Sequence, residues 1–203
     1  MTDEKRPYRK KLRAELEART ARRITESTVE LHGTLGPSRT SISAVAKRAG
    51  VRRSTVYRYF PDEAALFAAC SAHWMAANPV PDLGGWAAMD DADRRLSVAL
   101  GELYAHYGRT EQMMTNILRD EASMPIVQQQ LSGYREYLLA ARDTLVGGRR
   151  LRGRSGQGVV AAIGHALAFA TWRSLTREQG LGDAQAVDAM CRLVAAMTTD
   201  PRR

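Results

Sequence analysis

Residues 41–60 constrain the fold of this chain more than any other segment; they read SISAVAKRAGVRRSTVYRYF. Apolar residues recur three and four apart over residues 42–49, which places them on one face of a short helix. Gly50 follows, and glycine readily adopts the left-handed conformation that ends a helix. A second helix is predicted from about residue 53 to residue 60. Two short helices joined by a tight glycine turn predict a helix-turn-helix.

The second helix of this motif carries basic and hydroxyl side chains and no acidic one. Val56 and Phe60 share one helical face and are expected to pack inward, which turns the other side chains outward. An arginine can bind guanine O6 and N7 together, a contact worth about 1–3 kcal/mol of discrimination. Hydroxyls suit phosphate oxygens, which fix the register of a protein on DNA. The residues predicted to contact DNA are Ser41, Arg52, Arg53, Ser54, Thr55, Tyr57, Arg58 and Tyr59.

Ser41 precedes the first helix of the motif and is predicted to be its N-cap, with the hydroxyl accepting from a backbone N–H of the first turn. Such a helix start also attracts phosphate, because its N–H groups are free and the helix dipole favours an anion. Capping alone would explain Ser41, so a phosphate contact is an additional hypothesis.

The positive charge of the chain lies beside this motif. The formal net charge is +8; residues 1–60 hold 15 Lys/Arg and 6 Asp/Glu, whereas residues 61–203 hold 15 and 16. This distribution predicts a polyanionic partner for the first third, and double-stranded DNA is the natural one. Residues 1–23 are especially basic, and Pro7 predicts an arm that precedes the first helix. That arm is either a solvated tail or a segment that lies along the DNA backbone or enters the minor groove.

Several patterns bear on compartment. Cys70 and Cys191 lie in apolar helical patterns, so we expect buried, reduced thiols in a cytoplasmic protein. The first residues contain no apolar stretch of the kind found in signal peptides. The longest apolar run, residues 159–172, is shorter than the roughly 20 residues of a membrane span and contains His165. No membrane partner is therefore expected.

An ordered set of short matches, at residues 40–42, 45–51, 54–61 and 65–66, resembles the signature of the TetR/AcrR family of bacterial transcriptional regulators. The resemblance implies an all-α fold of about nine helices. It comprises an N-terminal three-helix DNA-binding head with a helix-turn-helix, followed by an all-helical ligand-binding and dimerisation domain. The implied domains are a basic N-terminal arm at 1–18, a helix-turn-helix DNA-binding domain at 19–64, and an effector-binding and dimerisation domain at 65–203.

Three positions depart from the family pattern. Glu63 stands where members usually carry a lysine that often touches a phosphate, so that anchor is lost. His32 stands where a phenylalanine is common, which predicts looser packing beneath the helix-turn-helix. Arg52 stands where serine is frequent, which predicts an operator preference peculiar to this chain.

The remaining chain is predicted to be helical, and its last two helices, about 158–177 and 184–197, are expected to form a homodimer interface of four helices. Aromatic and methionine side chains among these helices could line an effector cavity, although each alone is more often a core residue. Such a lining favours a mostly apolar or aromatic effector, with His165 supplying an orienting hydrogen bond. The candidate lining residues are Trp74, Tyr104, Tyr107, Met114, Tyr134, Tyr137, His165 and Phe169.

These patterns predict a homodimeric DNA-binding transcriptional regulator: a repressor released from a palindromic operator by a small effector. The alternative is an architectural or nucleoid-associated DNA-binding protein on the same fold without a small-molecule switch. An enzyme is not expected, because the sequence shows no constellation of catalytic roles. No metal site or cofactor is expected either, since the histidines at 32, 73, 106 and 165 lack metal-ligand spacing.

Overall fold

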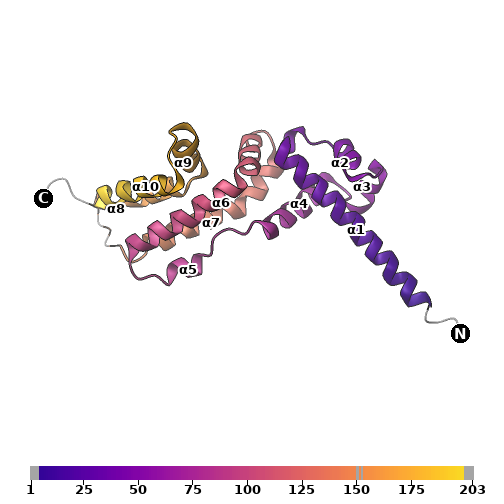
Figure 1. The fold of residues 1–203 in the computed structure, drawn as a ribbon, viewed down its shortest axis with the longest axis horizontal. Helices are drawn as coiled ribbons and strands as arrows, with labels where there is room; N and C mark the ends of the chain where they lie inside the picture. The colour runs from indigo at the N-terminus through magenta and orange to yellow at the C-terminus, as the bar shows by residue number, and fades with distance from the viewer. Residues whose placement is uncertain (1–4, 150, 152, 199–203) are drawn as a thin grey trace. The chain divides into compact units, whose positions relative to one another are not determined.

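The structure is a computed structural model, and it describes residues 5–149, 151 and 153–198 (Figure 1). Within these ranges every regular element is helical, which confirms the predicted all-α class; ten α-helices occur, against about nine expected. The elements in chain order are α1 (Lys5–Thr34), η1 (Pro37–Arg39), α2 (Ile42–Ala49), α3 (Arg53–Tyr59), α4 (Glu63–Ala77), α5 (Leu83–Ala87), α6 (Ala92–Glu121), α7 (Pro125–Val146), α8 (Gly153–Leu167), α9 (Phe169–Arg173), η2 (Ser174–Glu178) and α10 (Asp183–Thr198).

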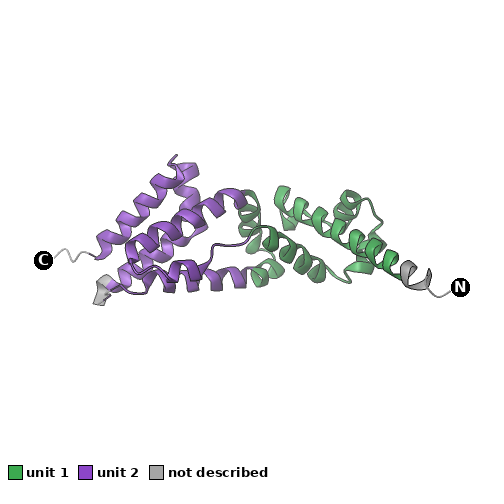
Figure 2. Ribbon diagram, turned by 60° about the horizontal axis from the view of Figure 1, so that its bottom comes forward, with its two compact units in different colours: residues 1–78, 112–130 green, residues 79–111, 131–203 purple. Residues whose placement is uncertain are grey.

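The chain forms two compact units (Figure 2). The first, called the head unit here, runs to Asn78 and also includes Gln112–Gln130. The second, called the body unit, comprises Pro79–Glu111 and the chain from Leu131 onward. Helices α6 and α7 therefore contribute residues to both units.

The core of the head unit joins α1, α2, α3 and α4. Ile24 of α1 and Val56 of α3 are fully buried in it. The apolar face predicted for α2 is confirmed, since all four of its apolar residues at three- and four-residue spacing are buried there. Phe60 is partly buried and packs against the same cluster, as its helical face predicted. This core fixes the angle at which α3 leaves the head.

The local signals of the helix-turn-helix also match the structure. Ser41 caps α2, its Oγ accepting a 3.2 Å hydrogen bond from the Ala44 N–H. Gly50 ends α2 in the left-handed conformation, at φ 64° and ψ 39°. Asp62 caps α4 by accepting a 2.7 Å hydrogen bond from the Ala65 N–H.

Helix α1 begins earlier than the sequence predicted. It starts at Lys5, so Pro7 lies inside its first turn rather than in an arm before the helix. The reason is that the first four N–H groups of a helix have no intrahelical partner, so a proline there sacrifices no hydrogen bond. Residues 1–4 of the predicted arm lie outside the described residues.

In the body unit, α6 buries an apolar stripe that runs from Leu96 to Tyr107. The helix predicted at 158–177 is instead divided: α8 ends at Leu167, Ala168 is extended at ψ 134°, and α9 follows. Two tyrosine hydroxyls on α6 donate hydrogen bonds to the backbone carbonyls at the end of α8. Tyr104 donates to Ala166 O at 2.9 Å and Tyr107 donates to Leu167 O at 2.6 Å.

No helix among the described residues combines the length and apolar character needed to cross a membrane. Of the two free cysteines, Cys70 is buried as predicted, whereas Cys191 is only half-buried because its α10 position lies at the edge of the packed face. Burial raises the pKa of the Cys70 thiol to about 12.

Candidate nucleic-acid interface

The outward face of α3 carries most of the side chains that sequence reasoning assigned to DNA. Val56 is fully buried and anchors the opposite face in the core. Thr55 and Tyr59 lie at the edge of the packed face and are half-buried. The predicted contact residues that the structure exposes are Ser41, Arg52, Arg53, Ser54, Tyr57 and Arg58.

The arginines of this face differ in their surroundings. The guanidinium of Arg58 lies over the ring of Tyr59, 5.0 Å from its centroid, and its Nη2 is 3.4 Å from the Tyr59 hydroxyl. By contrast, Arg52 and Arg53 form no ion pair with any residue that the structure describes. Both stand at the N-terminal tip of α3, where Arg52 is the N-cap position and no side chain caps the helix. The two free guanidinium groups are therefore available to a ligand.

An ion pair braces α2 against α1. Arg48 donates from Nε to the Glu30 carboxylate at 3.0 Å and from Nη2 at 2.6 Å. Both side chains are about half exposed, so the pair contributes little to stability, on the order of 1 kcal/mol or less. Its effect is to neutralise Arg48 and leave Lys47 as the free cation of α2.

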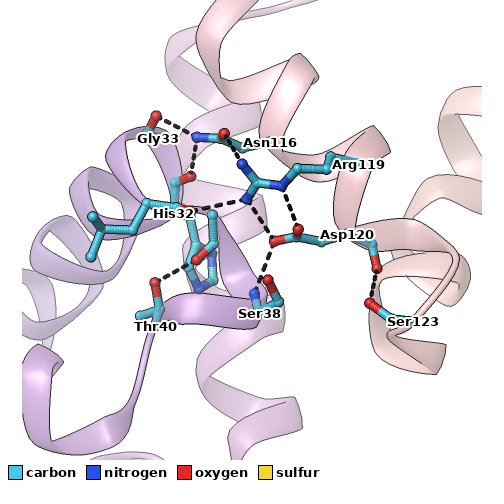
Figure 3. Close-up of polar contacts among 10 residues, drawn as sticks. His32, Gly33, Ser38, Thr40, Asn116, Arg119, Asp120 and Ser123 are labelled. Carbon is cyan, nitrogen blue, oxygen red and sulfur yellow. Dashed lines mark hydrogen bonds and ion pairs between the residues drawn. The ribbon is translucent and has the colours of Figure 1, made fainter.

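Three side chains of α6 hold the corner between α1 and α2 (Figure 3). Asn116 donates from Nδ2 to the carbonyls of His32 and Gly33, at 3.1 and 2.7 Å, where α1 ends. Arg119 donates from Nη1 to Asn116 Oδ1 at 3.1 Å and from Nη2 to Leu35 O at 3.0 Å. These bonds give partners to carbonyls at the end of α1, of which His32 O also accepts from the Gly36 N–H at 3.1 Å.

Asp120 completes this group, called the α6 latch here and defined as Asn116, Arg119 and Asp120. Its carboxylate is almost fully buried and accepts from Arg119 Nε at 2.8 Å and from the Ser38 N–H at 2.9 Å. Burial alone would raise the pKa of Asp120, but the hydrogen bonds from Arg119 and Ser38 outweigh it and hold the pKa below its usual value. Asp120 is thus a buried anion at neutral pH.

Gly36 lies directly against the latch. Its φ is 94°, a conformation that residues with a side chain rarely adopt. A Cβ at this position would overlap the Arg119 guanidinium and lie 2.6 Å from Asp120 Oδ2. Glycine is therefore required here both by the backbone and by the space.

His32 packs beneath the motif as a neutral ring. Its ring lies 5.1 Å from that of Phe67, centroid to centroid, and its Nδ1 is 3.7 Å from Cys70 Sγ. Burial lowers the pKa of His32 to about 4, against the opposing charge of Asp120. A cavity of about 60 Å³ borders this ring and the start of α2. The looser packing expected for a histidine here stays a prediction.

The family model described as "Bacterial regulatory proteins, tetR family" matches residues 24–70, which span the whole helix-turn-helix and its core. Residues 24–70 thus resemble the DNA-binding domain of this family, as the sequence pattern predicted. Members of the TetR family are DNA-binding transcriptional regulators, which fits the exposed basic face of α3. The buried and capping residues described above hold this family's motif in place.

Solved structures share the TetR-like fold over most of the chain. A protein named for regulation of fatty acid metabolism, from Clostridium perfringens, has a TM-score of 0.63 and 12% identity, covering 88% of this chain and 99% of that one. A TetR-like regulator from Rhodococcus sp. RHA1 has a TM-score of 0.63 and 17% identity, covering 87% and 93%. A TetR regulator from Haloarcula marismortui has a TM-score of 0.56 and 12% identity, covering 89% and 97%. No curated protein matches this sequence.

The residues predicted to line an effector cavity are divided between the two compact units. Trp74 and Met114 belong to the head unit, and the other six belong to the body unit. In the body unit, Tyr107 is the centre of a packed group: its hydroxyl is 2.8 Å from that of Tyr134, and its ring meets Phe169 edge-on at 5.3 Å.

The other three predicted lining residues have different surroundings. The hydroxyl of Tyr104 donates to Ala166 O, and that of Tyr137 donates to Pro81 O at 3.0 Å. His165 is exposed, with its Nδ1 3.3 Å from Thr171 Oγ1.

Sequence reasoning missed His106, which it considered only as a metal ligand. The side chain is buried, and its Nδ1 has no hydrogen-bond partner among the described residues. Burial lowers the pKa of His106 and favours the neutral ring; because the ring N–H is hydrogen-bonded to the Pro79 carbonyl, the unpartnered Nδ1 is an acceptor. The part of the chain that the structure describes contains no cluster of three or more potential metal ligands.

Proposed function

We propose that this TetR-family regulator is a homodimeric repressor that leaves a palindromic operator when a small effector binds. The observation that carries the proposal is the exposed tip of α3, where Arg52 and Arg53 project from a helix anchored by the buried Val56. In this type of motif the N-terminal residues of the recognition helix contact the base edges in the major groove. Arg52 and Arg53 are accordingly assigned to guanine, and the hydroxyls of Ser41, Ser54 and Tyr57 to phosphates.

Dimerisation is proposed through α8 and α10. These helices pack along each other in the body unit (Figure 1), and an open hollow of about 520 Å³ lies against α8. The residues that border the hollow are mostly small or apolar: Arg142, Leu151, Gly156, Gln157, Val160, Ala161 and Gly164. Small side chains let the helices of a second copy approach closely, as in a four-helix bundle. Two-fold symmetry would then place a second head about one turn of DNA, roughly 34 Å, or more away.

The effector is proposed to bind in the body unit beside the aromatic group around Tyr107. The unpartnered Nδ1 of His106 supports this, because a buried acceptor left unpaired costs about 1–3 kcal/mol and a ligand donor would recover it. The effector is therefore a small, mostly apolar or aromatic molecule with one hydrogen-bond donor. Helix α6 carries His106 and Tyr107 in the body unit and the α6 latch in the head unit, so it is the proposed route of coupling. An effector acts by favouring one arrangement of the heads over another.

A gel shift on the DNA upstream of the protein's own gene tests the proposal at one fixed salt concentration. The wild type is expected to prefer this DNA over scrambled DNA, and Arg53→Ala should lose about tenfold or more of that preference. Arg94→Ala is the matched control, because Arg94 is an exposed arginine of the body unit and lies outside the proposed dimer helices. Equal affinity of the wild type for both DNAs would instead support the architectural alternative and contradict the proposal.

A further inference from the structure

The N-terminal part of α1 is a helix without a packing partner. Every residue from 10 to 19 is exposed, and the first residue that α1 contributes to the core of the head unit is Ile24. The match to the TetR family model also begins at residue 24. The basic helix before Ile24, residues 10–23 where side chains are described, therefore lies outside the segment that matches the family model; it is called the α1 extension here.

The α1 extension is strongly cationic. Residues 5–23 hold nine Lys/Arg and two Asp/Glu. Arg13 is paired with Glu17 at 3.0 Å, and Arg22 with Glu26 at 2.8 Å. Four cations of the extension form no ion pair with any residue that the structure describes, and all four are exposed: Lys10, Lys11, Arg19 and Arg23. Such a concentration of unpaired positive charge favours binding to a polyanion.

We propose that the α1 extension lies along the phosphate backbone of DNA that flanks the base pairs read by α3. In Figure 1, α1 continues well past α2 and α3 within the head unit. Ile24 shares a core cluster with Val56 of α3, so packing fixes the direction in which the extension leaves the motif. A helix from Lys5 to Thr20 is about 24 Å long at 1.5 Å per residue, the length of about seven base pairs.

This inference rests on DNA binding by the head and not on the proposed effector, repression or dimer. It also decides between the two forms of DNA contact that the sequence left open. An extended arm can follow the minor groove, but a continuous helix is too wide for a groove of about 6 Å. The contact is therefore with phosphates, and it adds affinity and a longer footprint without adding base recognition.

Two exposed leucines on the same helix suggest a membrane surface as the alternative partner of the α1 extension. Leu12 and Leu16 are 45% and 54% exposed, and their spacing from Arg19 and Arg23 places all four on one side of the helix. A basic helix with an apolar pair is also a form that binds anionic membrane surfaces. Charge complementarity with the polyanion that this family already binds favours DNA, and the leucines provide a variant that separates the two occupants.

Salt dependence of binding to a scrambled duplex of about 30 base pairs tests the proposal, because the slope of log K against log salt counts phosphate contacts. The triple variant Lys10→Gln, Lys11→Gln, Arg19→Gln should lower the slope by about 2–3 per subunit. The control is Arg94→Gln, Arg109→Gln, Arg173→Gln, which removes three exposed cations of the body unit outside the proposed dimer helices and should leave the slope unchanged. An unchanged slope in the first variant would overturn the proposal, even if specific operator binding holds.

The second arm compares Leu12→Ser, Leu16→Ser with the charge variant. The leucine variant should keep the wild-type slope on DNA, and the wild type itself should not bind vesicles of equal parts phosphatidylglycerol and phosphatidylcholine at the salt where it binds DNA. Vesicle binding that both variants lose, together with DNA binding that neither loses, would assign the extension to a membrane instead. Thermal melts should coincide for all variants, since every substituted residue is exposed.

Discussion

The carboxylate of Asp120, on α6, accepts a 2.9 Å hydrogen bond from the backbone N–H of Ser38, in the turn that leads into α2. The two residues are 82 positions apart in the chain and lie in the same compact unit. Because Asp120 is buried and also bonded to Arg119, it holds the entry to the helix-turn-helix in one geometry. The latch thereby makes the position of α2 depend on the end of α6.

Asp120→Asn should destabilise the protein by about 1–3 kcal/mol, because it removes the charge that Arg119 and Ser38 hydrogen-bond. Urea unfolding followed by circular dichroism measures the change in midpoint. Asp188→Asn is the control, since its carboxylate is 59% exposed and paired only with an exposed arginine. Equal urea midpoints for the two variants would show that the charge of Asp120 does not stabilise the folded protein.

Gly36→Ala should cost at least about 2 kcal/mol more than Gly50→Ala, because Gly36 combines a glycine-only backbone conformation with contact to the latch. Gly50 also has a positive φ, but a Cβ there would meet nothing within 4 Å. Both variants place a side chain at a positive φ, but only Gly36→Ala combines it with ψ 157° and with overlap of the Arg119 guanidinium. Similar losses of unfolding free energy for Gly36→Ala and Gly50→Ala in urea would mean that Arg119 and Asp120 can move to accommodate the added methyl group.

The helix-turn-helix was predictable because its signals are local. The apolar spacing of α2, the cap at Ser41 and the left-handed Gly50 each depend on residues within one or two helical turns. The start of α1 was misjudged for an equally local reason: Pro7 suggests a break, yet proline is tolerated in a first turn. Local patterns thus sufficed for the motif and for most element boundaries.

The latch and the break after α8 were not predictable from the sequence. The latch joins Asp120 to Ser38 across 82 residues, and no periodicity marks either one. The break at Ala168 contains neither proline nor glycine. The hydroxyls of Tyr104 and Tyr107, some 60 residues away, donate to the carbonyls of Ala166 and Leu167 that the break frees. Contacts of this kind arise only when distant helices pack, so a single sequence gives no warning of them.

Stability should fall as the pH drops from 6.5 to about 4, in part because of His32. Its pKa is about 4 in the folded protein and 6.5 when unperturbed, so in this range the unfolded chain binds a proton that the folded chain does not. This loss of unfolding free energy is absent above pH 6.5 and reaches about 2–4 kcal/mol near pH 4. His32→Phe, which restores the residue common in the resembling family, should reduce this pH dependence.

Urea midpoints at pH 7, 5.5 and 4.5 provide the measurement for the histidine prediction. Some pH dependence should persist in His32→Phe, because burial also lowers the pKa of His106 and acts with the same sign. His73→Gln is the control on α4, where the side chain is only half-buried. If His32→Phe and His73→Gln follow the wild-type curve equally, His32 does not titrate as proposed.

Tyr107→Phe should destabilise the body unit by about 1–3 kcal/mol, because Leu167 O then loses its 2.6 Å donor inside the core. The same change also breaks the 2.8 Å contact with the Tyr134 hydroxyl. Tyr57→Phe is the matched control, since Tyr57 is 41% exposed and its hydroxyl makes no hydrogen bond with the described residues. Hydrogen exchange at the amides of α8 and α9 locates the effect, and faster exchange there in Tyr107→Phe alone is the expected result. Exchange that stays at the wild-type rate would show that the break between α8 and α9 does not need the tyrosine hydroxyl.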